Sequence, residues 1–437
     1  MRGLAVLDKL VPVQNVPPAQ ELERSSILDI VSYDLALDLT GGTDTFSSRT
    51  EVRFRCRRTG AAAFAVLQAV TVRRAALNGA DLDLTWTYHP GRLELSRLAG
   101  ENTLVVDAEF GYTSAGAGLH RVAGPDGSAC VYSKAYPGGA PRIYCCFDQA
   151  DMRAPFTVSI NAPAGWACLA NGPVVSRPAG GAAGLWTFAT TSPIAPYLAS
   201  FCAGPYSGTA FSCERDRREP LPVTVNALPS AAAVLEAVVS PDLFRKPLSC
   251  YERSLGAAYP YGKCDLVFVP AFPGLAFGAP GLITIKDQVL TEAQNGKPAL
   301  YLASVIAHEL AHAWFGGLVD VCRRDDEWLI EPLTTYISRT ALGEIHPGAT
   351  PWAPATSQTL PDHAYARDAA AVRQLEGLIG RQAVLNGLRD LLHRHAHGCA
   401  TKDDLVQCWS RASGRDLREW AADTLIPTTS DENEKTP

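Results

Sequence analysis

The chain lacks the features that mark membrane-spanning, secreted and nucleic-acid-binding proteins. It contains no run of about 18 apolar residues, which a membrane helix requires. The N-terminus, MRGLAVLDKLVPVQ, is too short and too interrupted by charge to be a signal peptide. Acidic residues (45) outnumber lysine and arginine (39), so the net charge of -6 gives no reason to expect nucleic acid or a membrane as a partner. We therefore expect a cytoplasmic protein.

Cysteine pairs with metal-binding spacing are also missing. The 12 cysteines are scattered, and none forms a Cys-x-x-Cys pair. In a reducing compartment we expect them to be mostly small core residues. Cys322 is interpreted as a loop residue or, alternatively, as a thiol near the site described below. His393, His395 and His397 alternate along an expected helix and point in different directions, which indicates a solvated helix end rather than a metal site.

Length and composition are those of a globular protein with two or three domains. Apolar residues make up 47% of the 437 residues and charged residues 19%. Short alternating stretches and Gly- or Asn-containing turns predict an antiparallel β domain at 26–205. Helical periodicity then dominates 206–426. Residues 1–25 form an N-terminal extension, and 427–437, PTTSDENEKTP, is expected to be a disordered tail.

Within the second domain, the pattern predicts one pair of sheet segments among helices. The two strands are expected at 266–269 and 282–285, with a Pro- and Gly-rich loop at 270–281 between them. Long helices are expected at 298–315 and at 369–395. The domain is therefore α+β and mainly helical.

One motif points to a definite chemistry. His308-Glu309-Leu310-Ala311-His312 is followed by Glu331. Two histidines four residues apart lie on one face of a helix, so both rings reach one metal, and Glu309 reaches a water on that metal. Two histidines and one glutamate leave zinc an open position, where bound water becomes a nucleophile at neutral pH and Glu309 can act as general base. A helix that merely contains two histidines is the alternative.

Further motifs, distributed over nearly the whole chain, resemble one family. They are Tyr33–Leu39 (YDLALDL), Gly118–Arg121 (GLHR), Cys146–Asp151 (CFDQAD), Tyr259–Pro270 (YPYGKCDLVFVP), Gly281–Thr284 (GLIT) and the histidine motif. In this order they resemble the gluzincin aminopeptidases of family M1, of the aminopeptidase N and leukotriene A hydrolase type. The resemblance implies an N-terminal antiparallel β-sandwich or saddle domain, followed by a thermolysin-like, mainly helical catalytic domain.

The resemblance also assigns roles to single residues. His308, His312 and Glu331 would bind one Zn²⁺ per chain, and Glu309 would be the general base. Asp326, five residues before Glu331, matches the acid that orients a ligand histidine.

A catalytic tyrosine is implied as well. Tyr365 fits loosely the family's Tyr-x-Lys-Gly-Ala-x-x-Val pattern. It is our candidate for stabilising the oxyanion, a contribution worth about 3 kcal/mol. An ordinary interfacial tyrosine is the alternative.

The chain departs from the family where the substrate's free α-ammonium group is held. The family's Gly-Ala-Met-Glu-Asn loop falls on 275–279, which makes Ala276, Phe277 and Gly278 substrate-binding positions. Gly278 then occupies the place of the amine-binding glutamate. Because a buried ammonium without a paired carboxylate costs several kcal/mol, we expect ordinary aminopeptidase action to be weak or absent unless another acid substitutes.

A second departure affects the family's Gln-x-Glu segment. An alignment without gaps puts Lys134 on its glutamine and Tyr136 on its glutamate. Lys134 either faces a carboxylate or phosphate group of the substrate or lies at the rim of the site in water.

We therefore favour a zinc-dependent hydrolase of aminopeptidase ancestry, acting on an amide bond in a specialised substrate without free-amine recognition. The substrate would be a small peptide or a peptide-like molecule, free or attached to a carrier. The alternatives are an ordinary aminopeptidase, a zinc enzyme acting on an epoxide or ester, and a binding protein with a vestigial site. The family's C-terminal helical domain is not found after Trp420, so we expect an open site. The oligomeric state cannot be predicted.

Overall fold

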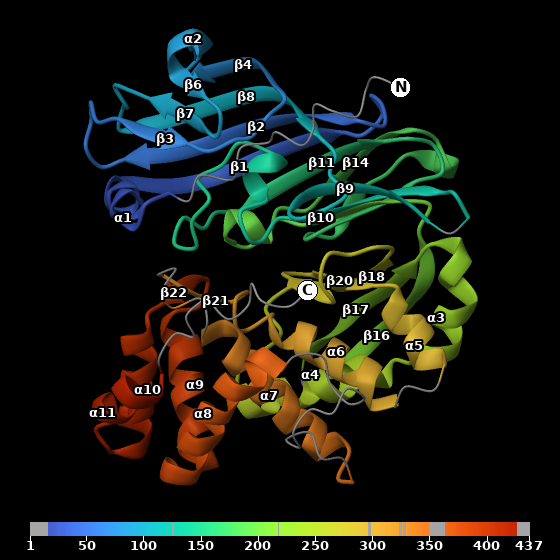
Figure 1. Cartoon of the computed structure of the whole chain (residues 1–437), viewed down its shortest axis with the longest axis vertical. Coiled ribbons are helices and arrows are strands. Elements are labelled where there is room, and N and C mark those ends of the chain that lie inside the picture. Colours follow the sequence, from blue (N-terminus) through green and yellow to red (C-terminus); the bar gives the residue numbers. More distant parts are fainter. Residues whose placement is uncertain are drawn as a thin grey trace. The chain divides into compact units, whose positions relative to one another are not determined.

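The computed structural model describes residues 16–124, 126–216, 218–295, 299–322, 326, 329–348 and 363–425 (Figure 1). Its contacts divide the chain into two compact units. Unit 1 contains the described residues up to Ser212 together with Leu221–Val239 and Tyr261–Gln294. Unit 2 contains Cys213–Pro220, Ser240–Pro260 and the described residues from Asn295 onward. The domain boundaries expected from the sequence stay predictions.

A mainly antiparallel sheet of eight strands forms the largest part of unit 1. Its strand order is β13-β14-β11-β1-β2-β8-β4-β5. Buried and partly exposed side chains alternate along β8, so one face of the sheet packs into the core. The strands are β1 (Leu28–Asp38), β2 (Thr45–Cys56), β4 (Thr71–Leu77), β5 (Ala80–Asp81), β8 (Glu101–Gly111), β11 (Phe156–Ala162), β13 (Val174–Ser176) and β14 (Gly184–Phe188).

Two smaller sheets complete the β-rich region, with the orders β3-β7-β6 and β12-β15-β10-β9. The elements are α1 (Pro18–Ile27), β3 (Ala63–Ala65), α2 (Leu84–Thr87), β6 (Tyr88–His89), β7 (Arg92–Leu95), β9 (Gly118–Ala123), β10 (Ala129–Lys134), β12 (Ala167–Ala170) and β15 (Phe201–Gly204). An N-terminal β-rich region followed by a mixed region with helices confirms the predicted fold class.

The tyrosine of the YDLALDL motif lies at the centre of this core. Tyr33 is fully buried, and its ring stacks on Phe156 with centroids 4.3 Å apart. Its hydroxyl oxygen accepts a hydrogen bond of 3.0 Å from the backbone N–H of Phe147 in the CFDQAD motif. These two motifs therefore meet in the structure.

A buried histidine in unit 1 leads to a prediction about stability and pH. His120 is 0% exposed, stacks on Tyr132 with ring centroids 5.0 Å apart, and its Nε2 lies 3.1 Å from the carbonyl oxygen of Gly116. Burial, opposed by the hydrogen bond to Gly116 and helped by the charge of Lys134, lowers the pKa of His120 from 6.5 to about 4. Between these pH values the unfolded chain binds a proton that the folded chain does not, so stability falls as the pH falls.

We expect His120 to remove about 3 kcal/mol of unfolding free energy between pH 6.5 and pH 4. Urea denaturation of the wild type and of His120→Phe at several pH values measures this contribution of His120 to the free energy of unfolding. Phenylalanine keeps an aromatic ring on Tyr132 but cannot take up a proton. The wild type should lose stability relative to the variant on acidification, and parallel pH profiles would contradict the prediction.

A five-stranded sheet follows, with the order β16-β17-β18-β20-β19. Its strands are β16 (Ser207–Arg215), β17 (Arg218–Ala227), β18 (Cys264–Val269), β19 (Ala276–Ala279) and β20 (Leu282–Lys286). β18 is buried throughout and pairs in parallel with β17 and β20, which explains the apolar run at 266–269. The predicted loop at 270–281 is wrong in part, because β19 pairs antiparallel with β20. Its sequence, Ala-Phe-Gly-Ala, has little intrinsic strand preference, so pairing with β20 decides its structure.

The turn between β19 and β20 is fixed by the side chain of Lys263 and by close packing against the backbone of Asn171. The ammonium group of Lys263 donates hydrogen bonds to the carbonyl oxygens of Gly281 (2.9 Å) and Ala170 (2.6 Å), and it pairs with Asp265. Gly281 has φ +71°, and a Cβ there would lie 2.4 Å from the carbonyl oxygen of Asn171. This position therefore requires glycine.

Helices and one short parallel strand pair make up most of the remaining described residues. The elements are α3 (Ala232–Val238), α4 (Asp242–Leu255), α5 (Gln288–Gln294), α6 (Ala299–Ala311), β21 (Val319–Val321), α7 (Ile330–Ile345), α8 (His363–Ile379), α9 (Arg381–Arg394), β22 (Gly398–Ala400), α10 (Lys402–Ser413) and α11 (Arg418–Thr424). The helix expected at 369–395 is two helices, because Gly380 has φ +83° and interrupts it.

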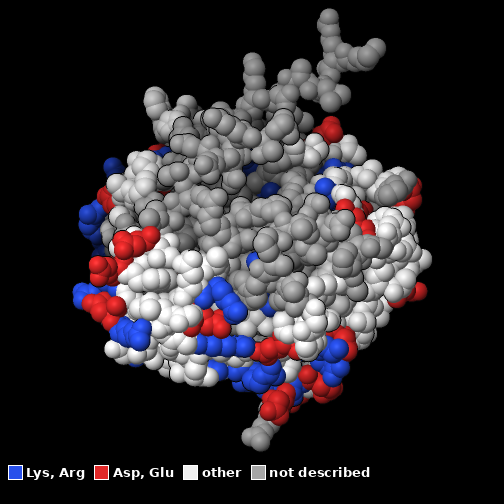
Figure 2. Space-filling view, turned by 60° about the horizontal axis from the view of Figure 1, so that its bottom comes forward, with Lys and Arg blue, Asp and Glu red and all other residues white. Residues whose placement is uncertain are grey.

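None of the helices in the described part of the chain is both long and apolar enough to cross a membrane. On the face drawn in Figure 2, acidic and basic side chains of the described residues lie interspersed.

Candidate metal centre

Two helices bring the histidine motif and its glutamate together. His308 lies in the last turn of α6, and His312 follows one residue after its end, with the two rings 4.9 Å apart between centroids. Glu331 lies in the first turn of α7. The helix expected at 298–315 ends earlier than predicted. Beyond Ala311 the backbone closes in turns, and the N–H of Trp314 donates to the carbonyl of Ala311.

The three side chains have the spacing that a zinc ion needs. Nε2 of His308 lies 3.1 Å from Oε2 of Glu331, and Nε2 of His312 lies 3.5 Å from Oε1. The three ligand atoms all lie within 4.8 Å of one another. Ligands about 2.0–2.1 Å from a tetrahedral ion are about 3.3 Å apart, so these residues fit zinc. Among the described residues, these three are the group of metal-binding side chains close enough together to hold a metal ion.

Hydrogen bonds and charge keep these groups in the form that binds a metal. Nδ1 of His312 lies 3.2 Å from the carbonyl oxygen of Phe315, so Nδ1–H donates there and the Nε2 lone pair is left for the metal. Burial lowers the pKa of His312 below 6.5 despite the nearby carboxylate, which favours neutral imidazole. Burial alone would raise the pKa of Glu331, but the proximity of His312 and the hydrogen bond with His308 lower it to about 2.

Aromatic side chains hold α6 in place. The Tyr251 hydroxyl, on α4, donates a hydrogen bond of 2.7 Å to the carbonyl of Ala307, just before His308. Trp314 is fully buried, contacts Tyr251 edge to face, and donates from its indole nitrogen to the carbonyl of Ala257 (3.2 Å). Sequence reasoning did not identify these supports, because their partners are backbone atoms about 57 residues away.

The predicted general base and the predicted orienting acid have different surroundings. Glu309 is 9% exposed in the last turn of α6. The carboxylate of Asp326 accepts a hydrogen bond of 3.1 Å from the backbone N–H of Lys402 at the start of α10. Its role toward a ligand histidine stays a prediction. The backbone of Tyr365 belongs to α8, but its side chain lies outside the described residues, so its role also stays a prediction.

The predicted substrate-binding residues belong to unit 1. Lys134 ends β10, is partly buried, and burial lowers its pKa. Tyr136 lies beside two aromatic rings, with centroids 5.3 Å from Tyr197 and 6.5 Å from Phe277. Gly278 pairs with Ile283 in the β19–β20 ladder. Strand alternation directs residue 278, like Ala276, to the face opposite Phe277.

Cys322 lies outside the helices and strands, which agrees with its interpretation as a loop residue, but the alternative of a thiol near the site is wrong. Its sulfur is bonded to that of Cys399, 77 residues further along the chain. Parallel pairing of β21 with β22 brings the two cysteines together, and such pairing cannot be deduced from cysteine spacing. The other ten cysteines are free and buried, as expected for small core residues.

Comparison with known proteins points to a peptidase family. Residues 240–362 match the model of the peptidase family M1 domain. The chain is 31% identical to an aminopeptidase N of Streptomyces lividans, over 94% of this chain and 52% of that protein. It is 23% identical to a leucyl aminopeptidase of Saccharolobus solfataricus, over 91% of this chain and 53% of that protein. It is 25% identical to a probable aminopeptidase of Sulfurisphaera tokodaii, over 70% of this chain and 42% of that protein. The chain spans about half the length of these relatives.

Proposed function

Because the chain belongs to peptidase family M1, we propose that it is a zinc-dependent hydrolase that cleaves an amide bond in a small peptide or a peptide-like substrate. The convergence of His308, His312 and Glu331 carries this proposal, since their ligand atoms lie within 4.8 Å of one another. One Zn²⁺ held there would polarise the scissile carbonyl group and acidify a water molecule.

The chain's own residues would divide the proton transfers and the charge stabilisation. Glu309 takes a proton from the attacking water and delivers it to the departing amine nitrogen, which must be protonated to leave. Tyr365, assigned by its match to the family pattern, donates a hydrogen bond to the oxyanion. Asp326, assigned in the same way, holds a ligand histidine in orientation.

The proposed substrate does not present a free α-ammonium group. At the two positions to which the resemblance assigns the family's amine-binding acids, this chain has glycine (residue 278) and tyrosine (residue 136). The ring of Tyr136 lies beside the aromatic rings of Tyr197 and Phe277. An ammonium desolvated beside such rings gains less than one paired with a carboxylate. An N-blocked amide is accommodated without that cost.

Steady-state kinetics on two matched substrate sets test this proposal. Aminoacyl-naphthylamides carry the free amine, and their N-acetylated counterparts do not. We expect a higher kcat/KM for the acetylated set, together with loss of activity when the metal is chelated. Turnover of the free-amine set alone would contradict the proposed specificity, although it would leave zinc-dependent hydrolysis intact.

Ordinary aminopeptidase activity is the second candidate. It is favoured by the name of the relative with 31% identity, an aminopeptidase N. It requires an acidic side chain, from a position other than 136 and 278, to pair with the substrate ammonium group. The same substrate comparison separates the two candidates.

A further inference from the structure

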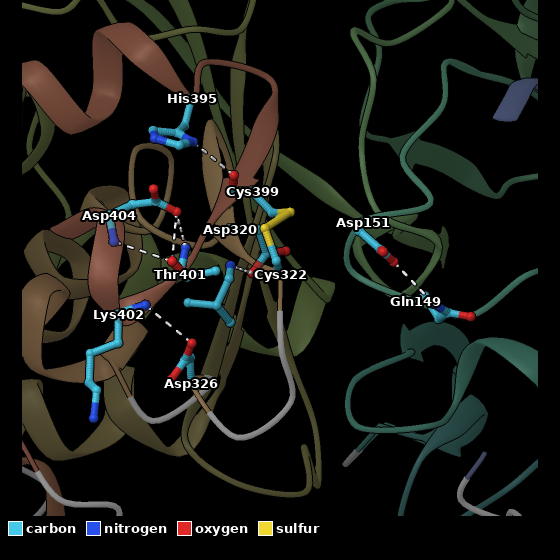
Figure 3. Close-up of a disulfide and its surroundings, with 11 residues drawn as sticks. Gln149, Asp151, Asp320, Cys322, Asp326, His395, Cys399, Thr401, Lys402 and Asp404 are labelled. Carbon is cyan, nitrogen blue, oxygen red and sulfur yellow. Dashed lines mark hydrogen bonds between the residues drawn. A yellow bond between two sulfur atoms is a disulfide. The ribbon is translucent and has the colours of Figure 1, made fainter. Parts of the chain in front are cut away.

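The Cys322–Cys399 disulfide, drawn in Figure 3, joins the stretch of chain between His312 and Glu331 to the strand before α10. Cys322 follows β21, and Cys399 lies in β22. Both bridged cysteines are partly exposed, whereas the ten free cysteines are buried. A thiol reductant in solution therefore has better access to this bridge than to the other sulfur atoms.

The residues that precede Cys322 in the chain are packed closely around His312. The N–H of Gly317 donates to the carbonyl of His312 (2.9 Å), and the N–H of Gly316 donates to the carbonyl of Val319 (2.8 Å). Gly316 has φ +94°, and a Cβ there would lie 3.3 Å from Ile330 and 3.8 Å from Nδ1 of His312. The chain therefore passes from the ligand histidine to β21 through a closely packed turn.

In the other direction along the chain, Glu331 follows Cys322 by nine residues. Within this stretch the carboxylate of Asp326 is held by the backbone N–H of Lys402, as drawn in Figure 3. Leu329 and Ile330, at the start of α7, line the same small apolar cavity as Val321 and Ala400. The backbone N–H of residue 322 also donates to the carbonyl of Ala400 (3.0 Å). Cys322, where this segment begins, and the side chain of Asp326 are thus both bonded to residues 398–402.

We infer that the Cys322–Cys399 disulfide is a positioning element of the metal site and makes metal retention sensitive to thiol reductants. The inference rests on the proposed function, because it takes His308, His312 and Glu331 as the zinc ligands. The start of α7 is fixed by hydrogen bonds, by packing and by this one covalent bond. Glu331 must keep its place opposite the two histidines at the end of α6, and zinc tolerates little displacement of its ligands.

The redox step is a thiol–disulfide exchange. A first glutathione thiolate attacks one sulfur atom, the Cys322–Cys399 bond breaks, and a mixed disulfide forms. A second glutathione thiolate attacks the mixed disulfide and releases glutathione disulfide. Two cysteine thiols are formed, so the bridge is reduced by two electrons and takes up two protons while two glutathione molecules are oxidised.

Thiol counting tests the bridge itself. Unfolded without prior reduction, the wild type should titrate ten thiols, and after reduction it should titrate all twelve. Twelve thiols without reduction would overturn the inference.

Zinc release to a chromogenic chelator tests the positioning role. The double variant Cys322→Ser/Cys399→Ser should release zinc about tenfold faster than the wild type, in the range seen when groups that support metal ligands are removed. The wild type, reduced with glutathione and desalted, should release zinc at the rate of the double variant. Reduction of the double variant should change nothing. Circular dichroism checks that each sample is folded.

Cys408→Ala is the matched control, since Cys408 is a buried free thiol on α10 in the same unit. It should release zinc like the wild type. Equal release from the wild type and the double variant, or equal acceleration by Cys408→Ala, would overturn the inference. Neither result would contradict the proposed function. The proposed function fails instead if the untreated wild type binds no zinc, or if Glu331→Ala binds zinc as tightly as the wild type.

Discussion

Replacing Glu309 by glutamine is expected to lower kcat by about 10²- to 10⁴-fold, the contribution of a positioned general acid–base group. Glutamine has the size of glutamate and can still hydrogen-bond to water, but it cannot take up a proton at neutral pH. Glu309 is 9% exposed in the last turn of α6, between two ligand histidines in sequence. Removing its charge therefore changes the chemical step, while the ligand set of His308, His312 and Glu331 stays complete.

Metal content distinguishes this loss from a loss of zinc. Glu309→Gln should retain one zinc per chain by mass spectrometry or atomic absorption, and kcat should fall more than KM changes. His308→Ala is the comparison, because it removes a ligand and should lose the metal together with activity. If Glu309→Gln keeps its zinc and also keeps wild-type kcat on the preferred substrate set, Glu309 is not the base. If it loses its zinc, the assignment of Glu309 as a group that does not bind the metal is wrong.

The metal centre could be predicted from the sequence because most of its geometry is local. The spacing of His308 and His312 places both rings on one side of a helix whatever surrounds it. The ligand atoms then lie as expected, although α6 itself ends at Ala311 and a turn carries the second histidine. Glu331 comes from another helix, and only the resemblance to a family could connect it with the pair.

Other features depend on pairing between distant segments, which a single sequence does not encode in a readable form. The partner of Cys322 is 77 residues away, and β21 and β22 had to be placed side by side before the pair could be recognised. β19 became a strand because β20 offers it a pairing edge. Gly380 is different, because a glycine inside a helical pattern is a known sign of a break and could have been used.

The amine-binding position gives the last prediction: Gly278→Glu should raise kcat/KM on free-amine substrates by about a hundredfold, the value of a close desolvated charge pair. Residue 278 lies in the regular β19–β20 ladder opposite Ile283, where extended backbone accepts any L-residue without strain. The new carboxylate would stand where the resemblance places the family's glutamate, and it would pair with the substrate ammonium group. It should also lower activity on N-acetylated substrates, because it would then be desolvated without a cation.

The ratio of kcat/KM for the two substrate sets is the quantity to measure, since it cancels any general loss of active enzyme. Gly278→Gln adds the same bulk without charge and should not reverse the ratio. A reversal in the glutamate variant alone would mean that the missing charge, and not the shape of β19, determines substrate choice. An unchanged ratio would mean that residue 278 does not face the substrate's N-terminus. The feature that determines substrate choice would then have to be sought at another position.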